Sequence, residues 1–65
     1  MKFKIIETTG DFYESEVVTT DGGMEVGDKL HYKDVVYTIS DIVWVSPTVV
    51  KVACSNFIAV LKLIG

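Results

Sequence analysis

The sequence predicts a small all-β fold, and three observations lead to that class. Apolar residues recur with a period of two rather than 3.6 along most of the chain, as in strands with one buried face. β-branched and aromatic residues fill the runs between turn signals. No stretch combines helical periodicity with capping residues. We therefore expect one domain over residues 1–65, an antiparallel meander of five or six strands that is either strongly bent or closed into a barrel.

The first half of the chain predicts two strands and a long loop. Residues 2–7 (KFKIIE) alternate, with Phe3 and Ile5 on one face and lysines on the other. Residues 12–20 (FYESEVVTT) are rich in strand formers and half polar. Residues 19–28 (TTDGGMEVGD) predict a loop, because their glycines supply positions for positive φ angles.

The second half predicts consecutive hairpins. The expected strands cover residues 29–32, 35–45, 49–54 and 57–64, with turns at 33–34, 46–48 and 55–56. Pro47 fits a turn because it would interrupt a central ladder. A loop-rich first half followed by tight hairpins resembles the layout of SH3-like small barrels, in strand spacing alone. The alternative is an open sheet of five or six strands that pairs with a second copy.

One break in the alternation predicts a β-bulge. Tyr37 and Ile39 share a face. The next large apolar residues, Ile42 and Trp44, have the opposite parity. An extra residue at positions 40–41 would bring all four to one inner face. Such a bend lets a long strand pass from one sheet to another in a small barrel.

Two of the expected strands are apolar on both faces, which predicts self-association. A strand with one solvent-exposed face should alternate apolar and polar residues. A chain of this size buries only about 60% of its unfolded surface and has little left to cover a second apolar face. A second copy, most often related by two-fold symmetry, would cover it. We expect an oligomer interface formed by Val43, Val45, Ile58, Val60 and Ile64.

The charge distribution favours a basic protein partner. The net charge is −3 and there is no arginine, the usual bidentate reader of phosphate and guanine, so nucleic-acid binding is disfavoured. Seven acids and no base lie between residues 5 and 28: Glu7, Asp11, Glu14, Glu16, Asp21, Glu25 and Asp28. Whether the fold gathers these acids into one patch is left open by the sequence.

An aromatic flanked by acids is typical of a binding hot spot. We expect a partner-binding site formed by Phe12, Tyr13, Glu14 and Glu16, with Tyr13 on the outside. The expected function is a non-catalytic inhibitor or adaptor that contacts a basic protein, a role that suits accessory proteins of phages or mobile elements. The alternative is that these are ordinary exposed acids on a strand edge, with Tyr13 packed over a neighbouring strand.

A second hypothesis is a homo-oligomer that binds a small ligand, for example a nucleotide signal, in pockets between subunits. Its candidate ligand-binding residues are Lys29, His31, Lys33, Thr38 and Asn56. The simpler interpretation of His31 is a surface histidine, because it shares a strand face with the two lysines. A nucleic-acid-binding barrel is a third hypothesis.

No residue set predicts catalysis or a metal site. A cysteine nucleophile needs a base, and hairpin order keeps Cys54 away from His31, so we expect Cys54 to be a small buried hydrophobe. These two residues are too few for a zinc site, and no Gly-rich loop precedes a helix, so no metal or cofactor is expected. Glu14 and Glu16 are expected on one strand face, as exposed acids rather than a catalytic pair.

The expected cellular location follows from features that the sequence lacks. Asp41, Lys51 and Lys62 break the apolar runs into pieces of about ten residues, half of what a spanning helix needs. The first residues have no signal-peptide pattern, and a lone cysteine suits a reducing environment. We therefore expect no membrane segment and a cytoplasmic location.

Overall fold

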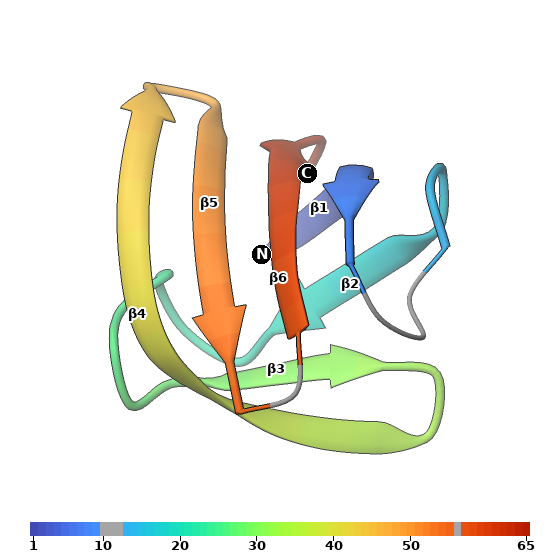
Figure 1. The fold of residues 1–65 in the computed structure, drawn as a ribbon, viewed down its shortest axis with the longest axis vertical. Coiled ribbons are helices and arrows are strands. Elements are labelled where there is room, and N and C mark those ends of the chain that lie inside the picture. The colour runs from blue at the N-terminus through green and yellow to red at the C-terminus, as the bar shows by residue number, and fades with distance from the viewer. Residues whose placement is uncertain (10–12, 56) are drawn as a thin grey trace.

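Six antiparallel strands form a closed barrel in which neighbours in the chain are neighbours in space (Figure 1). The structure is a computed structural model and describes residues 1–9, 13–55 and 57–65. The strands are β1 (Lys2–Thr8), β2 (Val17–Thr20), β3 (Lys29–Tyr32), β4 (Val35–Ser46), β5 (Val49–Cys54) and β6 (Phe57–Leu63). Strand β6 pairs with β1 and closes the barrel. The small all-β barrel is confirmed, and the open-sheet alternative is wrong because this closure leaves no free edge.

Every strand contributes to one core inside the barrel. The largest fully buried side chains are Phe3, Ile5, Val18, Leu30, Ile39, Val50, Val52 and Leu61. In β1 the alternation predicted from KFKIIE holds, since Phe3 and Ile5 are buried while Lys2 and Lys4 are exposed. Burying each large aliphatic or aromatic group contributes about 1.5–3 kcal/mol, which is the main favourable term for so short a chain.

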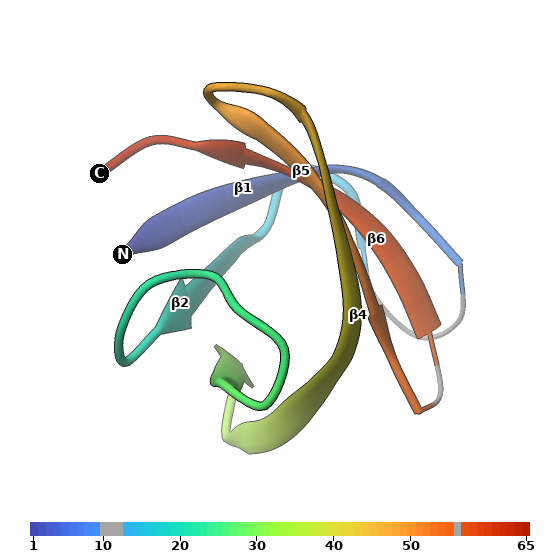
Figure 2. The same ribbon diagram turned by 90° about the vertical axis from the view of Figure 1, so that its left-hand side faces the viewer.

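The long strand β4 contains the predicted bulge. Ile39 pairs with Cys54 and Asp41 pairs with Ala53, so Ser40 is the additional residue. The hydroxyl of Ser40 donates a hydrogen bond to the carbonyl of Ala53 at 2.9 Å. Residues 35–38 of β4 pair with β3, and residues 39–46 pair with β5. Figures 1 and 2 show the bend by which β4 passes from one side of the barrel to the other.

The segment before β2 differs from the prediction. Strand β2 begins at Val17, not at residue 12, and Ser15 has a φ of 71° within a turn. That left-handed residue interrupts the extended backbone. Ser15 N–H donates to Ile5 C=O at 2.7 Å, and Ile5 N–H donates to Glu16 C=O at 2.9 Å, so the segment stays beside β1. The expectation that Glu14 and Glu16 share a strand face is therefore wrong.

The predicted glycine-rich loop occupies residues 21–28 and closes one side of the barrel. Met24 from this loop is buried in the core. Gly27 has a φ of 93° and its N–H donates to the carbonyl of Ile39 at 2.9 Å, which ties the loop to β4. Asp28 caps the turn by accepting a hydrogen bond from the Glu25 N–H at 3.1 Å. Figure 2 shows the loop crossing the barrel beside β2.

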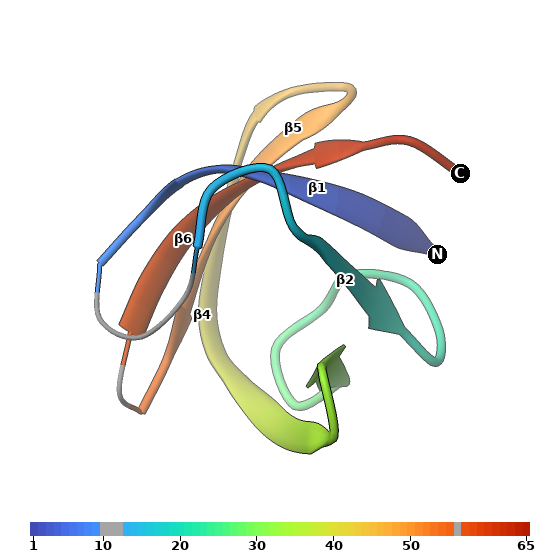
Figure 3. The ribbon, with the colours of Figure 1, turned by 90° about the vertical axis from the view of Figure 1, so that its right-hand side faces the viewer.

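The hairpin between β4 and β5 stands at the top of the view in Figure 3. Trp44 lies near this hairpin and pairs with the fully buried Val50, so it belongs to the inner parity. It is nevertheless 42% exposed. Tyr37 and Phe57 make an edge-to-face contact with ring centroids 5.0 Å apart. Of the described residues, none forms a helix that could cross a membrane.

Candidate functional site: the outer sheet face

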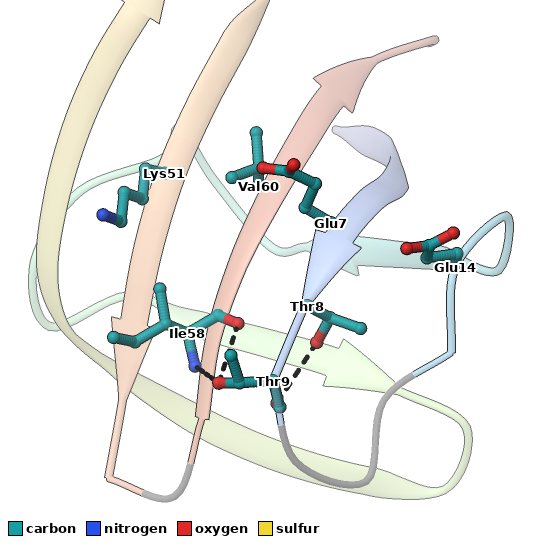
Figure 4. Close-up of a pocket in the computed structure, with 7 residues that line it drawn as sticks. All are labelled: Glu7, Thr8, Thr9, Glu14, Lys51, Ile58 and Val60. Carbon is teal, nitrogen blue, oxygen red and sulfur yellow. Dashed lines mark hydrogen bonds between the residues drawn. The ribbon is translucent and has the colours of Figure 1, made fainter.

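The outer surface of β4, β5, β6 and β1 carries two adjoining hollows. The larger, about 550 Å³ and open to solvent, is lined by Glu7, Thr8, Thr9, Glu14, Lys51, Ile58 and Val60 (Figure 4). The smaller, about 210 Å³, is lined by Asp41, Ile42, Val43, Lys51, Val52, Ala53 and Ile58. Lys51 and Ile58 line both, so the two form one continuous depression. We call this surface, together with the exposed residues beside it in 2–7, 41–46, 49–54 and 57–64, the outer sheet face.

Strand register fixes the rows of side chains on this face. Val43 pairs with Lys51, Lys51 pairs with Val60, and Val60 pairs with Glu7. The β1–β6 ladder includes a bulge between Ile5 and Glu7, which turns Glu7 to the outside. Figure 4 shows the resulting order from Lys51 through Val60 and Glu7 to Glu14. An aliphatic centre therefore lies between a lysine and two carboxylates.

Thr9 fixes the lower edge of the larger hollow to strand β6. Its N–H donates to the carbonyl of Ile58 at 3.0 Å, and its hydroxyl oxygen accepts from the Ile58 N–H at 3.2 Å (Figure 4). Thr8 donates its hydroxyl to the carbonyl of Thr9 at 3.3 Å. The two bonds between Thr9 and Ile58 hold the residue after β1 against β6 and so fix this edge of the hollow.

The charged groups of this face are not neutralised by one another. Across residues 1–9, 13–55 and 57–65, ion pairs join His31 to Asp21 and Lys33 to Glu16 only. Glu7, Glu14 and Lys51 take part in neither pair. Two lysines, Lys4 and Lys62, are opposite each other in the β1–β6 register, one row further along the same face.

The predicted partner-binding residues are divided between two places. Glu14 lines the larger hollow. Glu16 is half-buried, with its carboxylate 3.6 Å from the ammonium of Lys33. Tyr13 is 61% exposed, and the Lys33 ammonium lies 5.2 Å from its ring centroid. Phe12 lies outside the described residues.

The described acids between residues 5 and 28 do not gather into one patch, and Asp11 lies outside the described residues. Glu7 and Glu14 face the larger hollow, whereas Asp21 bonds His31 at 3.0 Å and Asp28 caps its own loop. Glu16 is held by Lys33, and that contact raises the pKa of the lysine through the attraction of the carboxylate. Burial and a hydrogen bond to Glu16 raise the pKa of Tyr32 beside it. Two acids of this stretch therefore belong to the candidate site.

The predicted ligand-binding residues do not converge on a common point. Lys29 donates to the hydroxyl of Thr38 at 2.7 Å. His31 is bonded to Asp21, and Lys33 to Glu16, so each of these side chains has a separate partner. Asn56 lies outside the described residues. Lys29 and His31 lie on β3, Lys33 in the turn after it and Thr38 on β4, and none of them lines either hollow.

The predicted oligomer interface lies on the outer sheet face. Val43, Val45, Ile58 and Ile64 are 56%, 67%, 43% and 47% exposed, and Val60 is half-buried between its neighbours. The opposite parity of β6, with Phe57, Ala59 and Leu61, fills the core. The doubly apolar strands thus have one face inside the barrel and the other in solvent.

Cys54 is a buried free thiol, as expected for a small hydrophobe. Burial raises the pKa of its thiol, so it stays protonated at neutral pH. Strands β3 and β5 are separated by β4, which keeps His31 and Cys54 on non-adjacent strands. Among the described residues, no three histidine, cysteine, aspartate or glutamate side chains cluster in a way that could hold a metal.

Glu7, Thr9, Asp41 and Lys51 line the depression but were not predicted as site residues. Lys51 and Asp41 interrupt otherwise apolar strands at outward positions, and that interruption was the available signal. Glu7 was hidden by the bulge, because strict alternation from Ile5 would place it inside.

No protein-family model, no curated protein and no solved structure matches this chain. The class defined by the fold and the site is a small closed antiparallel barrel with an open, mixed apolar and charged depression on one side.

Proposed function

We propose that the protein is a non-catalytic binding protein that contacts a basic protein partner through the outer sheet face, as an inhibitor or adaptor. The observation that carries the proposal is the placement of Glu7 and Glu14 beside an aliphatic floor formed by Ile58 and Val60. A lysine or arginine side chain combines an aliphatic stem with a charged head, and it suits both parts of such a depression.

The shape of the site supports a protein segment over a small molecule. Small-molecule sites usually enclose most of their ligand, whereas this hollow is open along the sheet. Lys51 and Ile58 extend the surface into the neighbouring hollow over β4 and β5. A segment of several residues could lie along both, with basic side chains near Glu7 and Glu14.

Self-association is a second candidate for the same face. It is favoured by the exposed aliphatic side chains Val43, Val45, Ile58 and Ile64, which no segment of the described chain covers. Patches of this kind mark protein interaction sites more often than plain surface. The two candidates use overlapping residues, so a second copy and a foreign partner would compete.

The small-ligand hypothesis has weaker support, because Lys29, His31 and Lys33 each already bond a side chain of their own chain. The nucleic-acid hypothesis also has little support, since the chain is net acidic and has no arginine.

The proposal is tested by selecting random displayed peptides on the immobilised protein. The selected peptides are expected to combine lysine or arginine with aliphatic residues. Their affinity is then measured by calorimetry against the wild type and against the double variant Glu7→Lys/Glu14→Lys. Reversal of both charges at the hollow should weaken binding by at least about tenfold.

The matched control is the double variant Glu25→Lys/Asp34→Lys, which makes the same change in net charge at exposed positions away from the hollow. It should bind the peptides nearly as well as the wild type. Equal losses in both double variants would mean that only overall charge matters, and would overturn the proposed site.

A further inference from the structure

We propose that a second copy of this chain covers the outer sheet face in a two-fold dimer, with strand β6 of one copy running antiparallel across β6 of the other. The inference rests on the proposed function, because it names an occupant of that same face. It further states which groups of the second copy meet Glu7, and therefore how the face is regulated.

Two columns of outward-facing residues, one along β6 and one along β1, form this face. On β6, Ile58, Val60, Lys62 and Ile64 follow one another at steps of two residues. On β1 and its extension, the residues beside them are Thr9, Glu7, Lys4 and Lys2. The face therefore consists of four rows: Ile58 with Thr9, Val60 with Glu7, Lys62 with Lys4, and Ile64 with Lys2. The row that contains Glu7 and the row that contains Lys4 and Lys62 lie between the two rows that contain an isoleucine.

Lys4 and Lys62 are directly opposite each other in the β1–β6 ladder. Like charges in that relation are destabilising. No carboxylate of the described residues forms an ion pair with either lysine. One row away, Glu7 forms no ion pair with a cation among residues 1–9, 13–55 and 57–65. Each copy therefore has an unneutralised acid and an unneutralised pair of bases on the same face.

A two-fold axis that lies in the interface, perpendicular to β6 and midway between the Val60 and Lys62 rows, brings these groups together. It reverses the order of the four rows in the second copy. Glu7 of one copy then faces Lys4 of the other, and Ile58 faces Ile64. Because the operation is two-fold, each of these contacts occurs twice. At these two kinds of contact an acid therefore meets a base, and one isoleucine meets another.

The arrangement also predicts how the face is regulated. In the dimer, Lys4 of the second copy occupies the place that a basic residue of a foreign partner would take beside Glu7. Dimerisation and partner binding then exclude each other, and the monomer is the form that binds. A selected basic peptide should therefore dissociate the dimer.

The test uses the single variants Lys4→Glu and Glu7→Lys in sedimentation velocity at low ionic strength, where charge contacts are least screened. The wild type is expected to be a dimer. Each variant alone places like charges opposite each other at both contacts, and should weaken the dimer by at least about tenfold. In an equimolar mixture of the two variants both contacts again join opposite charges, so dimer should reappear as the mixed species.

The matched controls are Lys29→Glu and Asp34→Lys, exposed reversals away from this face, which should leave the dimer intact. A second pair, Ile58→Glu and Ile64→Lys, tests the other row by the same mixing scheme. This second pair replaces the first if circular dichroism shows that Lys4→Glu or Glu7→Lys does not fold.

A monomeric wild type, variants that remain dimeric, or mixtures that remain monomeric would each overturn the proposed dimer. Peptide affinity is a separate readout. A monomer that still binds basic peptides would overturn the dimer and leave the proposed function standing, whereas a dimer that binds no peptide would do the reverse.

Discussion

The ammonium of Lys33 lies 3.6 Å from the carboxylate of Glu16, and this pair joins the β3–β4 turn to the segment that precedes β2. The same lysine lies over the rings of Tyr13 and Tyr32, 5.2 and 5.4 Å from their centroids. Glu16 and Tyr13, which were predicted to bind a partner, therefore contact Lys33 of their own chain and have a structural role.

Removing either partner of this pair should have a small effect on stability, because both groups are at the surface. Glu16→Gln and Lys33→Met should each lower the melting temperature by roughly 2–4 °C. A double-mutant cycle followed by thermal unfolding should show coupling that shrinks in high salt. Fully additive effects at low salt would show that the two residues do not interact.

The bulge at Ser40 should matter more than an ordinary surface serine. Ser40→Ala removes the hydrogen bond to the carbonyl of Ala53 and should cost about 0.5–1.5 kcal/mol in urea unfolding. The control is Ser55→Ala, at an exposed turn position, which should change stability by less than about 0.5 kcal/mol. If the two variants were equally stable, the Ser40 hydroxyl would have no role in the bulge.

Substitutions at two neighbouring residues of β6 should have different effects, one on the stability of the fold and the other on association. Leu61 is fully buried, so Leu61→Ala should cost about 2–5 kcal/mol of unfolding free energy through lost burial and a cavity. Val60→Ala changes the outer sheet face, and should weaken the dimer while leaving the monomer folded. Sedimentation velocity and urea unfolding of both variants check this division. A reversed result would place Val60 in the core.

Stability should fall as the pH rises above about 9, in part because of Cys54. Burial raises the pKa of this thiol from its ordinary value near 9.0. In the range just above that value the folded chain keeps a proton that the unfolded chain has lost, so rising pH favours unfolding. Tyr32 and Lys33, whose pKa values are also raised, act in the same direction at higher pH.

Urea unfolding of the wild type and Cys54→Ala between pH 7.5 and 9.5 measures this contribution. The variant should be less stable at pH 7.5, by about 1 kcal/mol, and its stability should decline less with pH. Parallel curves for the two proteins would mean that the thiol has the same pKa in the folded and unfolded chains.

Local patterns were enough to predict most of the barrel. The alternation around Phe3 and Ile5, and the change of parity between Ile39 and Ile42, identified strand β1 and the bulge in β4. Both follow from which side chains must be inside. The start of β2 could not be predicted this way, because the positive φ at Ser15 depends on hydrogen bonds to Ile5 across the sheet.

The candidate site was predicted only in part, for the same physical reason. Val43, Ile58 and Val60 follow from two-residue periodicity, which is local. The neighbours of Glu16 and Glu7 depend on register and on a bulge between Ile5 and Glu7, and these are properties of strand pairing. The acidic stretch between residues 5 and 28 is therefore divided in the fold. Two of its acids line the hollow, and several others bond residues elsewhere in the chain.

The claim that the outer sheet face is the interaction surface is tested most directly by NMR with a soluble paramagnetic agent. The methyl signals of Val43, Ile58 and Ile64 should be shielded from the agent at high protein concentration, or with a selected peptide bound, and exposed on dilution. The methyl of Val36, exposed on another part of the barrel, should be attenuated under all conditions. Equal attenuation of both groups at every concentration and with peptide would contradict the claim.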